Sequence, residues 1–251
     1  MMNTMVNSKG ETPRGRRYDA LLIDLDGTLL DLDLDKFIPA YMQSLAKYFS
    51  HHLPKEKFAF HLLSATENTI GSKDHSLTNE AAFFADFCRR LEVERREIDP
   101  LIKEFYEKDF PRLSSWGAPR PHAPDVLETA QQRDLKLVLA TQPIFPRVAI
   151  VERLAWGGLS AEPFDLITTM ENMHYCKPHQ EYYLEISRMI AVPPERCLMA
   201  GNNTQDDICA AQAGMGTFLV EGNIIDHGED IPPIDYRGTL EELAAFIDEE
   251  L

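Results

Sequence analysis

Short apolar runs that alternate with longer amphipathic segments constrain the fold of this chain more than any other feature. Such runs occupy residues 18–26, 135–141, 164–170, 196–202 and 216–222. The segments between them, and the C-terminal segment TLEELAAFIDEEL, carry apolar residues at helical spacing. Near-continuous apolar strands that alternate with helices are typical of a parallel sheet covered on both faces. The sequence therefore predicts an α/β fold with a doubly wound, Rossmann-like parallel sheet.

One long stretch interrupts this alternation. Residues 33–117 contain no convincing strand, and segments such as FIPAYMQSLAKYF and NEAAFFADFCRRLE have the pattern of helices. An insertion of this length is too large for a loop. We expect an all-helical cap over residues 33–117, inserted into an α/β core of residues 18–32 and 118–251, with residues 1–17 as a flexible N-terminal tail.

The net charge of −16 over 251 residues limits the classes of partner. So acidic a chain has no general attraction to nucleic acid or to anionic membranes. No apolar run approaches the length of a membrane span, and the N-terminus lacks the apolar segment of a secretory signal. The four cysteines have neither zinc-site nor CxxC spacing, which favours reduced thiols. We expect a cytoplasmic monomer or homodimer that binds neither nucleic acid nor membranes.

Polar residues follow the apolar runs at the places where a parallel sheet binds ligands. The first run ends in DLDGT (24–28), and the second ends in TQP (141–143). CKP (176–178) comes after the third run, and GNNTQDD (201–207) ends the fourth. Because the carboxyl ends of parallel strands meet at one edge of the sheet, we expect these acids, hydroxyl and lysine to share one site.

These four motifs resemble those of the haloacid dehalogenase superfamily, and of its phosphatase branch in particular. The resemblance covers nearly the whole chain from residue 18 onward, and the long helical insertion after DLDGT is similar to the helical cap of that family. The stretches LATQPIFPRVAIVERLAWGGL and ENMHYCKP also resemble one bacterial subgroup of hydrolases within it.

The resemblance implies a Mg²⁺-dependent phosphohydrolase that acts on a small phosphorylated metabolite through an aspartyl-phosphate intermediate. Asp24 would be the nucleophile, and Asp26 would protonate the leaving group and then activate water. Thr141 would hydrogen-bond a phosphoryl oxygen, and Lys177 would neutralise charge on Asp24 and on the phosphoryl group.

The same resemblance implies the binding residues. Gly27 would let the chain leave the strand sharply, and we expect Gly27, Thr28 and Gln142 to bind substrate. Mg²⁺ prefers oxygen ligands. It would be held by Asp24, by the backbone carbonyl of Asp26, and by Asn203 and Asp207 of the fourth motif.

The fourth motif departs from the family pattern. We expect Gly-Asn-Asp at its start, with the aspartate a metal ligand, but Asn203 stands at that position. An amide oxygen can coordinate Mg²⁺ but brings no charge. Three alternatives follow: weaker metal binding, replacement of the acid by Asp206 or Asp207, or loss of catalysis. We favour weakened binding, since the other chemical residues are intact.

Three further functions stay open at this stage. A phosphomutase would use the same four motifs, and a dehalogenase would need neither an acid at Asp26 nor a metal. A non-catalytic ligand-binding protein of the same fold is the third, and Asn203 is its only sequence indication.

Three further acids, Asp31, Asp33 and Asp35, follow DLDGT along the chain. We expect them to be solvated or to cap a helix, and we expect His179 at a surface helix start.

Overall fold

The centre of the molecule is a parallel sheet with the strand order β5-β4-β1-β6-β7-β8. The computed structural model describes residues 17–50, 55–226, 228 and 231–250, so residues 1–16 of the predicted tail lie outside the described residues. Every pair of neighbouring strands in this sheet is parallel. The strands are β1 (Ala20–Ile23), β4 (Lys136–Leu139), β5 (Leu166–Ile167), β6 (Cys197–Gly201), β7 (Gly216–Val220) and β8 (Tyr236–Gly238).

Both faces of this sheet are buried. Side chains of β1 alternate between them, because successive residues of a strand point to opposite sides. Leu21 and Ile23 join an apolar cluster with α5, α6 and α8, whereas Ala20 and Leu22 join a second cluster with α7 and η3. The prediction of a doubly wound α/β core is therefore confirmed. The covering elements are α5 (Ala123–Gln132), α6 (Arg147–Trp156), α7 (Gln180–Ile190), η2 (Pro194–Arg196), η3 (Ile208–Ala213) and α8 (Leu240–Glu250).

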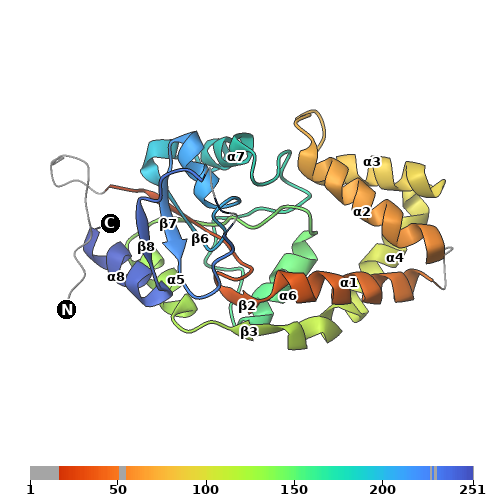
Figure 1. Ribbon diagram of the computed structural model, residues 1–251, viewed down its shortest axis with the longest axis horizontal. Helices are drawn as coiled ribbons and strands as arrows, with labels where there is room; N and C mark the ends of the chain where they lie inside the picture. The colour runs from red at the N-terminus through yellow and green to blue at the C-terminus, as the bar shows by residue number, and fades with distance from the viewer. Residues whose placement is uncertain (1–16, 51–54, 227, 229–230, 251) are drawn as a thin grey trace.

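Within the described part of residues 33–116, the regular elements are all helices, and they lie beside the core as a cap (Figure 1). They are α1 (Leu34–Phe49), α2 (Lys55–Gly71), α3 (Asn79–Leu91), α4 (Arg95–Lys108) and the 3-10 helix η1 (Phe110–Trp116). Where the chain leaves and re-enters the core, β2 (Leu30–Leu32) pairs antiparallel with β3 (Gly117–Pro119). These two short strands, and β8, are absent from the sequence prediction. We propose the β2–β3 pair as the boundary between cap and core.

Aromatic packing joins the cap to the core at the β2–β3 end. Phe37 of α1 is fully buried, and its ring lies 6.3 Å from that of Phe110 and 5.8 Å from that of Trp156 at the end of α6. Edge-to-face and offset pairs of this kind add to the free energy of apolar burial. The cap and core therefore share one apolar cluster.

Backbone hydrogen bonds attach the cap to the core at a second place. At the start of α3, the amide of Asn79 donates to the carbonyl of Met173 at 2.7 Å, and the amide of Glu80 donates to that of Met170 at 2.7 Å. The buried side chain of Asn79 also donates to the carbonyls of Pro143 and Tyr175. The first turn of α3 is thereby attached to the loop that follows β5.

The shared cluster predicts a large cost for removing one of its rings. Phe37→Ala should lower the free energy of unfolding by about 3–5 kcal/mol, because it leaves a cavity among the aromatic rings. Urea denaturation measures the loss. The matched control is Phe60→Ala on α2, where the side chain is 65% exposed and the cost should stay below about 0.5 kcal/mol. Equal losses in the two variants would show that the cluster does not join cap and core.

Candidate functional site

Two carboxylates leave the sheet at the end of β1. Asp24 and Asp26 are only 8% and 9% exposed. Gly27 makes the turn that separates them from the cap, with φ at +81°, and a Cβ there would lie 2.4 Å from the Asn202 side chain. A side chain at Gly27 would therefore strain the backbone and displace the loop after β6. This local geometry explains why a glycine follows the two acids.

A buried lysine bridges the first and fourth motifs. Lys177 is 2% exposed, and its Nζ donates to Asp24 Oδ1 at 2.8 Å and to Asp207 Oδ1 at 2.6 Å. Burial lowers the pKa of Lys177, but the carboxylates of Asp207 and Asp24 outweigh this and raise it well above its usual value. Burial raises the pKa of Asp207 to about 7, although Lys177 acts in the opposite direction. The lysine thus carries a positive charge between two acids.

The loop after β4 holds this lysine in place. Gln142 Nε2 donates to the backbone carbonyl of Lys177 at 3.1 Å, and the backbone amide of Lys177 donates to Gln142 Oε1 at 3.0 Å. Thr141 is buried at the same edge of the sheet, and its carbonyl accepts a hydrogen bond from the Tyr182 hydroxyl at 2.9 Å. Gln142 therefore positions Lys177, and its expected contact with substrate stays a prediction.

The Asn203 side chain of the fourth motif already makes hydrogen bonds within its own loop. Asn203 Oδ1 accepts from the amides of Gln205 at 2.9 Å and Asp206 at 3.0 Å, so this side chain stabilises the turn. The amide of Asn203 itself donates to Asp207 Oδ2 at 2.9 Å. Asn203 thus orders the loop that presents Asp207, a role that sequence reasoning did not include.

Thr28 lies beneath the two acids rather than beside them. Its hydroxyl is fully buried and lies 3.0 Å from Asn202 Oδ1 and 3.4 Å from Asp24 Oδ2. Thr28 thereby ties the first motif to the fourth. A hydroxyl has a single proton to donate, and the shorter distance favours the bond to Asn202.

A small hollow of about 50 Å³ gathers most of the predicted residues at the sheet edge. Its lining includes all the expected catalytic and metal-binding residues, namely Asp24, Asp26, Thr141, Lys177, Asn203 and Asp207, together with Gln142 and Asp206. Gly27 and Thr28 support the hollow without lining it. The four motifs are therefore brought together at one point, as parallel strands predict.

Arg153 is a charged residue of this region that the sequence reasoning missed. It lies on α6, is fully buried, and donates from Nη1 to Asp26 Oδ2. Its guanidinium carbon lies 4.4 Å from the centre of the Phe145 ring. Burial raises the pKa of Asp26, while the Arg153 charge lowers it. The only sequence indication was a cation on the apolar side of the helical segment RVAIVERLAW.

The oxygen donors of the hollow suit a hard cation such as Mg²⁺, which prefers carboxylate, carbonyl and amide oxygens. Asp24, Asp207 and Asn203 contribute such oxygens to one lining. Within the described residues, however, no three His, Cys, Asp or Glu side chains form a group arranged to hold a metal. The residues therefore fit the ion chemically, while their carboxylates are arranged around Lys177.

The sequence model described as haloacid dehalogenase-like hydrolase matches residues 18–214. The chain belongs to this family. It is 25% identical over 206 residues to the pyrophosphatase PpaX of Oceanobacillus iheyensis, a match that covers 82% of this chain and 85% of that protein. The expected resemblance to the family, and the expectation of a hydrolase, are both confirmed.

Solved structures share the fold of this haloacid dehalogenase-like chain. A HAD phosphatase from Thermococcus onnurineus has a TM-score of 0.58 at 21% identity, covering 93% of this chain and 100% of that chain. An L-2-haloacid dehalogenase from Xanthobacter autotrophicus has a TM-score of 0.54 at 15% identity, with 93% and 100% covered. At these identities the likeness extends to the fold, and the two structures do not separate phosphatase from dehalogenase.

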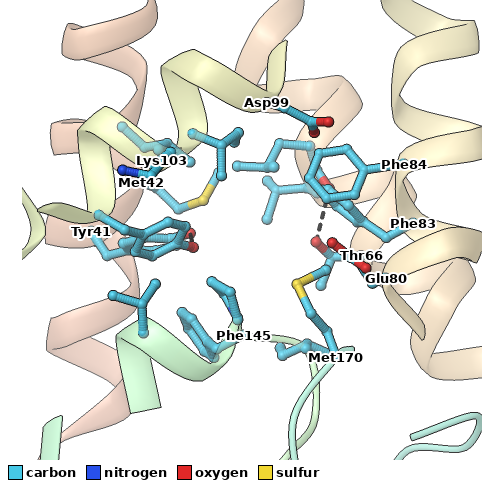
Figure 2. A pocket seen from close by; sticks show the side chains of 18 of the residues that line it. Tyr41, Met42, Thr66, Glu80, Phe83, Phe84, Asp99, Lys103, Phe145 and Met170 are labelled. Atoms are coloured by element: carbon cyan, nitrogen blue, oxygen red, sulfur yellow. Dashed lines mark hydrogen bonds between the residues drawn. The ribbon is translucent and has the colours of Figure 1, made fainter. Parts of the chain in front are cut away.

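The cap of this haloacid dehalogenase-like protein encloses a larger cavity, of about 370 Å³ (Figure 2). Figure 2 shows Tyr41, Phe83, Phe84, Phe145 and Met170 around it. Its lining comes from α1, α2, α3 and α4 on the cap side, and from Met170, the loop before α6 and Val148 of α6 on the core side. The cavity therefore lies between cap and core and is distinct from the hollow at the sheet edge.

The other residues noted in the sequence have structural roles. Asp33 caps α1 by accepting from the Lys36 amide, which confirms a capping role for one of the three outer acids. Asp31 is exposed, and its Oδ1 accepts from Asn223. His179 begins α7 as expected, and its Nε2 lies 3.0 Å from the carbonyl of Ile70 in the cap. None of the helices in the described part of the chain has the length and apolarity needed to span a bilayer.

The buried lysine bridge predicts a pH-dependent stability effect. Lys177→Met should lower the free energy of unfolding by about 3–5 kcal/mol at pH 8, because two buried carboxylates lose their cation. Burial already raises the pKa of Asp207 to about 7, and loss of the Lys177 charge raises it further above the unfolded value, so stability falls as pH increases and the loss should be smaller at pH 5. Urea denaturation at the two pH values measures this difference.

The control for this variant is Lys136→Met, which breaks an exposed pair with Asp165 at 2.7 Å. Exposed pairs contribute about 0–1 kcal/mol, so this control should lose little stability at either pH. A Lys177→Met loss that is small, or that does not grow with pH, would contradict the bridge.

Proposed function

We propose that this hydrolase is a Mg²⁺-dependent phosphatase that releases phosphate from a small phosphorylated metabolite. The observation that carries the proposal is the bridge from Lys177 Nζ to Asp24 at 2.8 Å and to Asp207 at 2.6 Å, beside Asp26. Such a grouping offers a nucleophile, a proton donor and a cation within one water-poor hollow, which phosphoryl transfer requires. The pyrophosphatase name of a relative makes inorganic pyrophosphate one substrate to test.

The first half of the proposed reaction transfers the phosphoryl group to Asp24. Asp24 Oδ2, the oxygen that does not bind Lys177, attacks phosphorus, while the bond from phosphorus to the leaving oxygen breaks. Asp26 gives its proton to that oxygen, and the pKa of Asp26 is raised by burial, which favours the protonated acid. Lys177 offsets the negative charge on the phosphoryl oxygens, and Thr141 binds one of them.

The second half returns Asp24 to its carboxylate form. A water molecule attacks phosphorus, the bond from phosphorus to Asp24 Oδ2 breaks, and Asp26 takes a proton from the water. Phosphate then leaves the hollow. Because the same Asp26 carboxyl gives and takes the proton, one turnover leaves its protonation unchanged.

When bound, Mg²⁺ would offset the repulsion between the carboxylates and the phosphoryl group. We assign it to Asp24, the backbone carbonyl of Asp26, Asn203 and Asp207. Asn203 Oδ1 already accepts two amide hydrogen bonds, which supports weak metal binding at this position. We also propose a cytoplasmic monomer or homodimer, a setting that agrees with four free, buried cysteines.

A second candidate is a catalytically impaired ligand-binding protein of the same fold. The engagement of Asn203 in its own turn favours it, because the expected acid is absent and its replacement is occupied. A dehalogenase is less well supported, since it has no need for Asp26 beside the nucleophile. Two variants distinguish the phosphatase from the impaired protein: Asp24→Asn removes the proposed nucleophile, and Asn203→Asp restores the missing acid.

Removing the nucleophile should abolish turnover. Asp24→Asn should lower kcat for p-nitrophenyl phosphate by about a thousandfold or more, because an amide cannot form the acyl-phosphate bond. A phosphate-release assay measures the rate. The matched control is Asp35→Asn, an exposed member of the same acidic stretch, which should keep the full rate. Turnover that survives Asp24→Asn would remove Asp24 from the mechanism.

Restoring the expected acid should strengthen metal binding. Asn203→Asp should lower the Mg²⁺ concentration for half-maximal activity by roughly tenfold, because it adds a charged oxygen ligand. Calorimetric titration with Mg²⁺ gives the same comparison without turnover. Gln131→Glu, an exposed change of equal charge on α5, is the control and should leave both values unchanged. Full activity of the parent protein in excess chelator would contradict the metal requirement.

A further inference from the structure

The catalytic hollow is too small to hold an organic phosphate. Its volume is about 50 Å³, whereas the cap cavity has about 370 Å³. Sites for small organic ligands typically have about 300–1,000 Å³ and mostly apolar walls. The organic part of a substrate bound at Asp24 must therefore lie outside the hollow, and the cap cavity has the size to take it.

Two stretches of chain line both spaces. On α1, Leu34 lines the hollow, and Ile38 and Tyr41 line the cavity on the same helical face. Four residues along a helix correspond to about 6 Å, so the cavity begins about one turn from the hollow. The loop after β4 repeats this arrangement, with Gln142 in the hollow and Phe145 in the cavity. The two spaces are therefore neighbours.

The polar side chains in the cavity wall are already engaged with one another. Arg95 pairs with Glu80 at 2.6 Å and with Asp99 at 3.1 Å. The hydroxyls of Tyr41 and Tyr106 hydrogen-bond at 2.8 Å. A charged ligand would have to compete with these contacts, whereas an apolar group would not.

The remaining polar residues of the cavity wall also have partners within the protein. Thr66 donates to the carbonyl of Leu62 at 2.9 Å on its own helix, and Lys103 pairs with Glu107. Two apolar wall residues from opposite sides, Leu63 of the cap and Val148 of α6, are 46% and 45% exposed. These two side chains extend the apolar wall of the cavity to the protein surface.

We infer that the cap cavity binds an uncharged, apolar organic group of a phosphate monoester whose phosphoryl group reacts at Asp24. This inference rests on the proposed phosphatase function. It favours aryl or medium-chain alkyl phosphates over sugar phosphates and over inorganic pyrophosphate, since those carry polar groups that would have to compete with the contacts already made by the polar residues of the cavity wall.

The test compares n-hexyl phosphate with ethyl phosphate, two esters of primary alcohols that leave equally poorly. The kcat/KM for hexyl phosphate should be higher by roughly tenfold or more, because each extra methylene enters an apolar wall. Met42→Trp, which fills the cavity from α1, should lower kcat/KM for hexyl phosphate and so remove this preference. Ile102→Phe on α4 is the second filling variant, and Met189→Trp on α7, where the methionine is 45% exposed, is the control.

Binding of n-hexylphosphonate and ethylphosphonate, measured by calorimetry, separates this inference from the proposed function. Tighter binding of the hexyl compound that Met42→Trp or Ile102→Phe abolishes supports the cavity, whether or not esters are hydrolysed. Hydrolysis with equal kcat/KM for the two esters, or a preference that both filling variants retain, overturns it. Absence of hydrolysis of every ester overturns the phosphatase proposal alone.

A separate observation concerns the buried ion pair at Asp26. Arginine usually binds a carboxylate through two parallel hydrogen bonds. Here Arg153 uses Nη1 alone, and Arg153 Nε, Arg153 Nη2 and Asp26 Oδ1 are buried without a partner among the residues that the structure describes. Unpaired buried donors and acceptors are costly, and an apolar residue would avoid that cost. Packing within α6 does not explain an arginine at this position.

The geometry points to Arg153 as a positioning residue for Asp26. One hydrogen bond fixes Asp26 Oδ2, and the ring of Phe145 fixes the guanidinium plane at 4.4 Å. Oδ1 is left without a partner in the described part of the chain, so it is the oxygen that exchanges a proton with the leaving group. Arg153 itself touches neither substrate nor phosphorus in this scheme.

Phenyl phosphate and p-nitrophenyl phosphate test this role, because they match in size but differ in leaving-group basicity. Arg153→Met should lower kcat by roughly a hundredfold for phenyl phosphate and far less for p-nitrophenyl phosphate, whose leaving group needs little protonation. Arg153→Lys should recover part of the loss. Arg147→Met, an exposed arginine on the same helix, is the control.

A double-mutant cycle decides whether Arg153 acts through Asp26. In an Asp26→Asn background, Arg153→Met should cause no further loss in kcat, because the group that it positions is absent. Equal losses for the two aryl phosphates, or full additivity with Asp26→Asn, would mean a purely structural role and would overturn the assignment. Denaturation midpoints of all variants keep folding defects apart from these rate ratios.

Discussion

The bridge from Lys177 to Asp24 and Asp207 is the interaction on which the rest of the site depends. It joins the end of β1, the loop after β6 and the loop before α7 through one buried ammonium group. Breaking a buried ion pair by removing one partner is strongly destabilising, so the bridge favours the arrangement of the three loops in which all three charges meet. Three neighbouring residues stabilise or make room for this bridge. Gln142 holds the lysine backbone, Asn203 orders the turn before Asp207, and Gly201 leaves room where a Cβ would lie 2.1 Å from Asp207 Oδ2.

The cap and the core are equally interdependent. Helix α1 contributes Leu34 to the hollow at the sheet edge, and its next turns contribute Phe37 to the shared aromatic cluster and Tyr41 to the cap cavity. Successive turns of one helix therefore line the proposed reaction site, pack against the core and line the proposed binding cavity. The loop after β4 lines both spaces, with Gln142 at the charged hollow and Phe145 at the mostly apolar cavity. The proposed function places the reaction in the first space and the organic group in the second.

The sequence predicts the parts of this site that follow from strand ends, and it misses those that follow from packing. Asp24, Thr141, Lys177 and Asp207 each follow a recognisable apolar run or a motif, so their convergence could be expected from the order of residues alone. Arg153 follows no such rule. It occupies an apolar helical face, and only the fold brings it to Asp26, 127 residues earlier. The strands β2, β3 and β8 have three residues each, too few for a periodic pattern. The cap cavity depends on how four helices meet, which no single segment encodes.

The hydrogen bonds at the start of α3 have a consequence for how the two parts of the protein communicate. The amides of Asn79 and Glu80 bind the carbonyls of Met173 and Met170, and the chain continues from there directly to Lys177. Helix α3 also lines the cap cavity, so its first turn connects the cavity wall to the segment that carries Lys177. If the proposed ligand binds in the cavity and the phosphoryl group at Lys177, we expect the two events to influence each other through this connection. Such coupling would be reciprocal: each occupied site would raise the affinity of the other by the same factor.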